Sequence, residues 1–276
     1  GILPLNGVGR IAVIGPVAKS SASLQGSWNG RGVYDETVTL YQGILDRFAP
    51  EAEIRFAKGS DLDKTTEVEL AQAVDTACWA DVVILCLGEE RRWSGENASR
   101  STIALPEAQL QLAEKIAATG KPVVVVLVAG KPFAIPYVKE AVPAVLAQWY
   151  AGEQAGTSIA DILFGNVNPS GKTPFSFPQS TGHLPVYYNH LSTDKGYYKE
   201  PGSYENPGRD YVFSSPDPLW VFGHGLSYTT FDFEKVSVDK QQYYPYDTIQ
   251  VSVQLKNTGK MEGKEVIQVY VRDMVS

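Results

Sequence analysis

The chain has 276 residues, of which 43% are hydrophobic, and a formal net charge of −7. This length suffices for one sizeable core and a smaller second unit, since domains commonly hold about 100 to 200 residues. The Lys and Arg residues are scattered, which excludes the basic stripe of a nucleic-acid-binding protein. No stretch reaches the roughly 18 apolar residues needed to span a membrane. We therefore expect neither a nucleic acid nor a membrane as a partner.

The first residues, Gly1 to Leu5, lack the features of a signal peptide and include no initiator Met. We expect the chain to be truncated at both ends. The two cysteines, Cys78 and Cys86, fall on a predicted helix end and a predicted central strand. This placement favours two buried thiols over a disulfide framework or a metal site, and it leaves the cellular compartment open.

Apolar runs and helical periods alternate along the first 180 residues. The runs predict strands, and apolar residues at steps of three and four predict helices. A capping box at Thr66–Glu69 predicts the start of one helix, and Gly120 and Gly165 stand where helices are expected to end. In chain order, we predict a strand over 11–15, a helix from 37, a strand over 54–57, a helix from 66, a strand over 82–87, a helix from 106, strands over 123–128 and 145–149, and a helix over 158–164.

Apolar strands that alternate with helices indicate a parallel sheet covered on both faces. We therefore predict an α/β fold for residues 1–180, with a mostly parallel sheet sandwiched between helices. Residues 181–228 are rich in Tyr, Pro, Gly and Asn, and we predict a connector that packs on the surface.

Alternating apolar residues over 229–276 predict a partial antiparallel β domain. We expect three strands there, within 231–238, 249–255 and 266–271, and a turn at Asn257–Gly259. Three strands leave an open edge and an uncovered apolar face. We therefore predict homodimerisation through residues 231–272, or disorder of that region.

The most informative stretch covers residues 88–106, between a predicted strand and a predicted helix. It carries three carboxylates, three guanidinium groups and one indole: Glu89, Glu90, Glu96, Arg91, Arg92, Arg100 and Trp93. Ligands of open α/β sheets bind at the carboxyl ends of the strands, where this loop is expected to lie. Such a loop is suited to protonating a leaving group beside a stacked ring, as the acid of a glycosidase does.

Trp28 stands in a Gly-rich loop, residues 26–32, where an indole can form a platform for a sugar ring; core packing is the alternative. Residues 165–173 superficially resemble a phosphate-binding loop, but the glycine spacing and Pro174 argue against that function. The three histidines, His183, His190 and His224, lack the spacing of zinc ligands, so we expect structural roles and no metal site.

A set of motifs is specific when taken together: Ile11–Pro16, Gly26–Trp28, Ser94–Arg100 with Leu105-Pro106, Asn168–Pro178, Phe222–Phe231 and Asn257–Gly259. With these motifs the chain resembles, over almost its whole length, the β-glucosidases of glycoside hydrolase family 3 of the bacterial periplasmic type. The resemblance implies an α/β sandwich domain followed by the start of a fibronectin type III-like domain. It also implies an N-terminal (β/α)8 barrel, in the same polypeptide, that holds the nucleophile. No segment of this sequence has that nucleophile's motif.

The resemblance implies a retaining exo-acting β-glucosidase, without a cofactor, in the periplasm or secreted, to which this chain contributes half of the catalytic pair. Glu96 falls at the position of the acid/base residue, with Glu89 and Glu90 as the alternatives. Trp28 falls at the aglycone side of the pocket, and Trp93 is a weaker candidate of the same kind. Arg100 would set the charge of Glu96 or fix the loop, or form only a surface ion pair.

We expect the chain to be inactive without the barrel. Two other functions remain open at this point. One is a β-xylosidase or arabinosidase of the same family. The other is a non-catalytic carbohydrate-binding or scaffold module, in which connector tyrosines hold sugar, namely Tyr187, Tyr188, Tyr197, Tyr198, Tyr204 and Tyr211.

Overall fold

The computed structural model describes residues 1–49, 51–189, 203–206 and 214–272. Its main feature is a five-stranded sheet in the order β2-β1-β3-β4-β5, and each neighbouring pair of strands is parallel. The strands are β1 (Arg10–Ile14), β2 (Glu53–Ala57), β3 (Val82–Gly88), β4 (Val123–Val128) and β5 (Ala144–Ala147). The predicted parallel α/β fold is confirmed.

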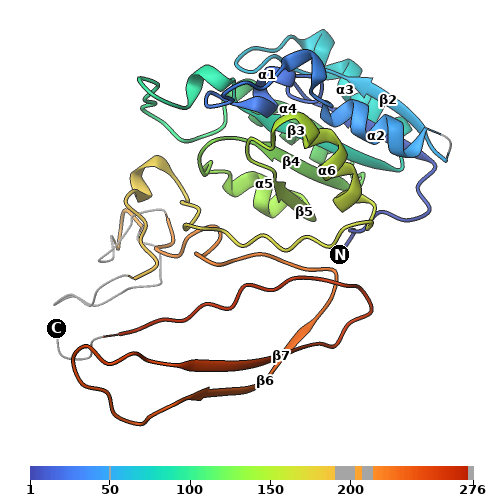
Figure 1. Ribbon diagram of the computed structural model, residues 1–276. Coiled ribbons are helices and arrows are strands. Elements are labelled where there is room, and N and C mark those ends of the chain that lie inside the picture. The colour runs from blue at the N-terminus through green and yellow to red at the C-terminus, as the bar shows by residue number, and fades with distance from the viewer. Residues whose placement is uncertain (50, 190–202, 207–213, 273–276) are drawn as a thin grey trace.

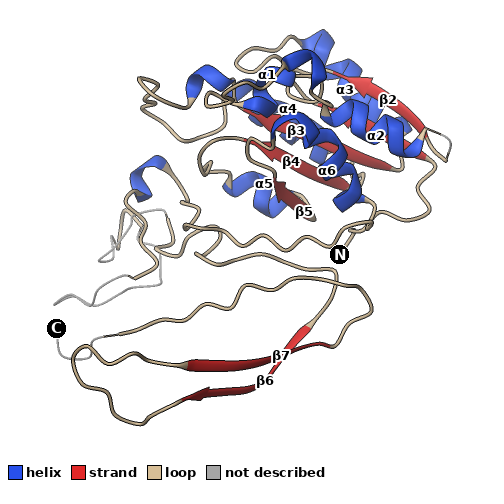
Figure 2. Ribbon diagram, in the orientation of Figure 1, coloured by secondary structure: helices blue, strands red, loops and turns tan. Residues whose placement is uncertain are grey.

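Helices cover both faces of the sheet (Figures 1 and 2). One face packs against α1 (Ser21–Gln25), α2 (Leu40–Phe48) and α6 (Ala155–Leu163). The opposite face packs against α3 (Glu67–Trp79), α4 (Glu107–Ala117) and α5 (Pro136–Ala141). Every residue of β3 and β4 is buried, because successive side chains of each strand point into the two cores in turn. Burial of each such Val, Leu or Ile contributes about 1.5 to 3 kcal/mol.

The start of α3 was predicted correctly from the sequence. Thr66 Oγ1 accepts a hydrogen bond of 3.2 Å from the Glu69 amide, and the Thr66 amide donates one of 3.0 Å to Glu69 Oε2. These reciprocal bonds satisfy two amides that the first turn of a helix leaves without partners.

Two glycines allow α2 and α6 to cross at close range. A Cβ atom built on Gly43 of α2 would lie 2.1 Å from the carbonyl oxygen of Gly156 in α6. One built on Gly156 would lie 2.0 Å from the carbonyl oxygen of Thr39. The backbones of these helices therefore occupy the space that side chains would need.

The second, smaller sheet is an antiparallel pair, β6 (Phe231–Val238) and β7 (Val251–Asn257). The third strand predicted over 266–271 is wrong, because the described residues after β7 form no strand (Figure 2). Glu265 instead pairs with Lys172 at 3.0 Å, and the ring of Tyr270 lies 5.9 Å from that of Tyr188. These contacts hold the segment against other parts of the chain, and its apolar side chains remain exposed.

The connector predicted over 181–228 falls partly on residues outside the described ranges, among them His190, Tyr197, Tyr198 and Tyr211. Its described end returns to the larger domain, where the amide of Phe177 donates to the Trp220 carbonyl at 2.8 Å. His183 is buried, its Nδ1 accepts from the Gln179 amide at 3.1 Å, and burial lowers its pKa. This burial and this hydrogen bond support the structural role that we predicted for His183.

The cysteine prediction was half right. Cys86 is fully buried in the sheet, and burial raises the pKa of its thiol. Cys78 is exposed on α3, which corrects the prediction of two buried thiols. The residues that cover the sheet from α3 are Leu70, Ala73 and Ala77, and Cys78 follows the last of them on the outer surface of the helix.

Candidate active site

Residues 88–106, the acidic loop, begin at the carboxyl end of β3, beside the carboxyl end of β4. Figure 1 shows this loop projecting from the end of the sheet near α1. The side chain of Gln109 in α4 closes the loop, because its Oε1 accepts from the Gly88 amide at 2.9 Å and its Nε2 donates to the Gly88 carbonyl at 2.8 Å. The loop thus starts and ends at fixed points of the fold.

Glu96 lies at the exposed tip of the acidic loop. Its neighbours Gly95 and Asn97 have φ values of +123° and +58°, so the backbone turns sharply on both sides of it. Glu96 makes no hydrogen bond or ion pair with any residue that the structure describes. Its carboxyl group is therefore open to solvent and to an incoming ligand.

The acidic loop contacts the Gly-rich loop that carries Trp28. The hydroxyl oxygen of Ser27 lies within hydrogen-bonding distance of the backbone carbonyl oxygens of Arg91 and Ser94. A Cβ atom built on Gly95 would lie 2.8 Å from Ser27 Cβ and 3.3 Å from Trp28 Nε1. The structure therefore brings the indole of Trp28 next to the turn that presents Glu96.

Trp28 is 74% exposed, so the alternative that it packs in the core is wrong. Trp93 is partly buried, and the guanidinium carbon of Arg100 lies 5.2 Å from the centre of its ring. Trp28 thus offers an open aromatic surface, whereas the ring of Trp93 makes a cation–π contact with Arg100.

Arg100 does not pair with Glu96. Its Nη1 lies 3.5 Å from Glu89 Oε2, and its Nη2 donates to the Ala104 carbonyl at 3.3 Å. Its side chain is largely buried, with an exposed fraction of 16%. The alternative that Arg100 forms only a surface ion pair with Glu96 is therefore wrong.

Glu89 and Glu90 differ sharply although they are adjacent. Glu89 is fully buried, and its two oxygens accept from the Gly130 amide at 2.7 Å, Lys131 Nζ at 2.5 Å and Tyr150 Oη at 2.8 Å. Glu90 lies near the surface and pairs with Arg92 at 2.5 Å. Neither carboxylate is presented to solvent as that of Glu96 is.

Sequence reasoning missed Ser27, Lys131 and Tyr150. Lys131 and Tyr150 follow the strands β4 and β5 within three residues, so their position at the carboxyl edge of the sheet was a usable signal. Burial, together with the hydrogen bond to Glu89, raises the pKa of the Tyr150 phenol. Tyr150 is therefore a neutral hydrogen-bond donor at physiological pH.

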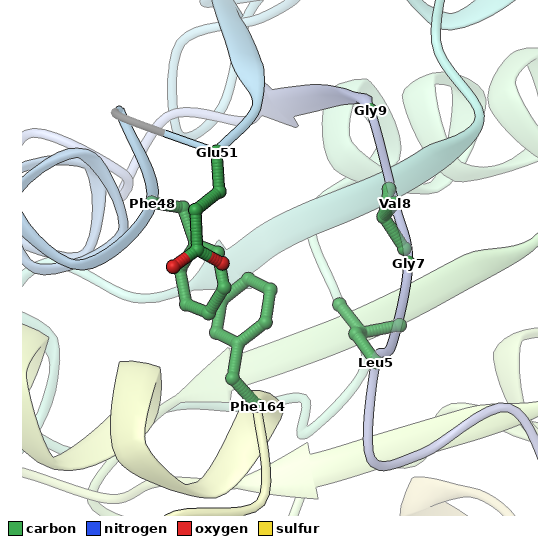
Figure 3. Close-up of a pocket in the computed structure, with 7 residues that line it drawn as sticks. All are labelled: Leu5, Gly7, Val8, Gly9, Phe48, Glu51 and Phe164. Carbon is green, nitrogen blue, oxygen red and sulfur yellow. The ribbon is translucent and has the colours of Figure 1, made fainter.

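A separate pocket of about 300 Å³ lies at the opposite, amino-terminal edge of the sheet. Its walls are the stacked rings of Phe48 and Phe164, the carboxylate of Glu51, and Leu5 with residues 7–9 (Figure 3). It shares no residue with the acidic loop.

The described residues contain no group of three or more His, Cys, Asp or Glu side chains that could hold a metal ion. Within the same ranges, none of the helices is both long and apolar enough to cross a membrane.

Comparison with known proteins relates this chain to a family of glycosyl hydrolases. The profile of the glycosyl hydrolase family 3 C-terminal domain matches residues 1–228. A periplasmic β-glucosidase of Salmonella typhimurium is 38% identical over 99% of the chain, and a β-xylosidase of Formosa agariphila is 36% identical over 99%. The chain spans 38% and 37% of the lengths of these two proteins.

Among solved structures, a β-glucosidase of Listeria innocua in complex with glucose superposes with a TM-score of 0.87. It is 36% identical to the chain, and the match covers 100% of this chain and 37% of that one. Fold, motifs and sequence identity agree over nearly the whole length, and on these grounds the chain belongs to glycosyl hydrolase family 3, as its C-terminal domain.

Proposed function

We propose that this chain is the C-terminal part of a retaining exo-acting β-glucosidase and supplies the acid/base residue, Glu96. The observation that carries the proposal is the closeness of Gly95 to Trp28, which places the turn that carries the exposed residue Glu96 beside an exposed indole. The periplasmic β-glucosidase of Salmonella typhimurium supports the same reaction class and the same compartment for this protein.

The chemistry follows from two carboxylates on opposite sides of the scissile bond. Glu96 first protonates the glycosidic oxygen while the nucleophile forms a glycosyl–enzyme, and then takes a proton from the attacking water. The nucleophile would come from a barrel domain of the same polypeptide and lie about 5 to 5.5 Å from Glu96. On this proposal the chain is inactive by itself, and the reaction requires no organic cofactor or metal ion.

The aromatic residues act on the aglycone side in this proposal. Pyranose rings present a face of C–H groups, and the open indole of Trp28 matches that face. Trp93 is a second contact at the same edge. Arg100 fixes the acidic loop through Glu89 and Ala104, which accounts for its buried position.

A β-xylosidase is the second candidate, because the Formosa agariphila relative of that name is 36% identical over 99% of the chain. Hydrolysis rates on aryl β-glucosides and aryl β-xylosides would separate the two. The acidic loop has the same role in both reactions.

The test is the Glu96→Gln variant of the full-length enzyme, assayed on aryl β-glucosides. Loss of the acid should lower kcat/KM by about 10²- to 10⁴-fold for a substrate with a poor leaving group. For a good leaving group the glycosyl–enzyme should accumulate, and azide should restore turnover by forming a glycosyl azide. Unchanged hydrolysis of every substrate would rule out Glu96 as the acid/base residue.

A further inference from the structure

We propose that Glu89 is a positioning residue. Its buried carboxylate holds the acidic loop and the Trp28 loop in fixed positions relative to each other. This inference rests on the proposed function, because Glu89 would act on the reaction through Glu96. It gives a role to a charged group that the catalytic steps do not use.

Glu89 is the point where three segments meet. Its oxygens accept from residues that follow β4 and β5, Gly130, Lys131 and Tyr150. A buried carboxylate is tolerated when it is paired and hydrogen-bonded, and these donors meet that condition. Because both oxygens are occupied and the side chain is fully buried, Glu89 cannot reach a substrate.

Two of its cationic partners also bind the backbone of the acidic loop. Lys131 Nζ donates to the Trp93 carbonyl at 3.2 Å, and Arg100 Nη2 donates to the Ala104 carbonyl at 3.3 Å. These carbonyls lie on either side of Glu96 in the chain. The charge of Glu89 therefore fixes both arms of the loop that presents Glu96.

The third partner, Tyr150, reaches the Trp28 loop. A Cβ atom built on Gly26 would lie 2.4 Å from Cδ2 of the Tyr150 ring, and one built on Gly130 would lie 2.6 Å from Cε2. Gly26 is the residue where α1 ends and the Trp28 loop begins. The phenol that donates to Glu89 thus packs directly under the start of that loop.

The substitution Glu89→Gln retains the size of the side chain but replaces one acceptor oxygen by an NH₂ donor. That donor would face Lys131, Arg100, Tyr150 or the Gly130 amide, which are themselves donors. The loops would lose a shared anchor and shift. Because a displacement of about 1 Å can cost about 100-fold in rate, the expected effect falls on the steps that need Glu96.

The experiment measures kcat/KM of the full-length enzyme on aryl β-glucosides with graded leaving groups. In Glu89→Gln we expect a loss of about 100-fold for the poorest leaving group and little change for the best. Tyr150→Phe retains the ring and removes one donor. It should show the same dependence on the leaving group, with a smaller loss of kcat/KM. Glu114→Gln, which changes an exposed carboxylate of α4 outside the acidic loop, is the control, and its dependence on the leaving group should equal that of the wild type.

Adding Glu89→Gln to Glu96→Gln provides the decisive comparison. A positioning role predicts no further loss in the double variant, because Glu96 is already absent. Equal losses for all leaving groups in Glu89→Gln and Tyr150→Phe, with a lowered Tm, would overturn the inference in favour of a purely structural role. If Glu96→Gln itself shows no dependence on the leaving group, the proposed function fails, and this inference fails with it.

Discussion

Lys172 Nζ lies 3.0 Å from Glu265 Oε1, and both side chains are largely buried. This ion pair joins the loop after α6 to the segment after β7, which are 93 residues apart (265 − 172). Lys172 also donates to the Gly225 carbonyl at 2.7 Å. The pair therefore links the larger domain to the C-terminal segment.

The ion pair predicts a pH-dependent contribution to stability. Burial raises the pKa of Glu265, but the Val266 amide and Lys172 outweigh it and hold the pKa below its ordinary value. The stabilisation is thus present above the pKa of the unfolded state and is lost as pH falls through the lower pKa of the folded state.

We expect Glu265→Gln to lower the free energy of unfolding by about 1 kcal/mol at pH 7. The difference from the wild type should shrink as the pH falls below the ordinary pKa of a glutamate, because the carboxyl group then becomes protonated. Urea unfolding at several pH values measures it, with the exposed Glu262→Gln as control. A difference that does not vary with pH would contradict the electrostatic origin.

The capping box of α3 predicts a cost for Thr66→Ala. The substitution leaves the Glu69 amide without its acceptor, and the free energy of unfolding should fall by about 1 kcal/mol. Thr76→Ala on the same helix is the control. Its hydroxyl donates to the Gln72 carbonyl within the helix, so the replacement by Ala should be neutral or slightly stabilising. Thermal unfolding tests both predictions, because Tm should fall for Thr66→Ala and stay the same or rise slightly for Thr76→Ala.

The crossing of α2 and α6 predicts that Gly43→Ala is strongly destabilising. In an open helix this change would gain about 1 kcal/mol from helix propensity. Here the new methyl group would collide with the Gly156 carbonyl, and a loss of about 3 kcal/mol is expected. Gly171→Ala, where a Cβ atom meets nothing within 4 Å, should change stability little. Urea unfolding followed by tryptophan fluorescence tests both variants.

The exposure of Trp28 predicts that its removal affects binding and not folding. Trp28→Ala should leave the free energy of unfolding within about 0.5 kcal/mol of the wild type. If the indole stacks on the aglycone, KM for an oligosaccharide should rise about tenfold, which corresponds to about 1.4 kcal/mol. Tyr246→Ala, an exposed residue between β6 and β7, should change neither quantity. A large fall in Tm for Trp28→Ala would show that the indole supports the fold.

Much of the fold was predictable because local pattern and burial agree. The run from Val82 to Leu87 has no polar residue, and it lies in the centre of the sheet. The sequence analysis did not identify α1 and α5, which have five and six residues and are too short to show a helical period. The alternation over 266–271 predicted a strand wrongly, because strand pairing depends on distant partners that a local pattern does not report.

The candidate site was predictable as a place and less so in its details. The strand-end rule located the acidic loop, but Glu89 and Glu90 are indistinguishable in the sequence. Their different roles depend on Lys131 and Tyr150, which lie 42 and 61 residues after Glu89. The burial of Arg100 depends on the same distant cluster.

The two hydrogen bonds between Gln109 and Gly88 fix both ends of the acidic loop independently of the residues between them. They pin the exit of β3 to α4, 21 residues apart in the chain, whatever lies between them. Doubling the length of such a closed loop costs only about 0.6 kcal/mol in entropy. The segment between Arg91 and Ala104 can therefore change in length without rebuilding the scaffold, provided that Glu96 and the anchoring contacts of Trp93 and Arg100 are retained.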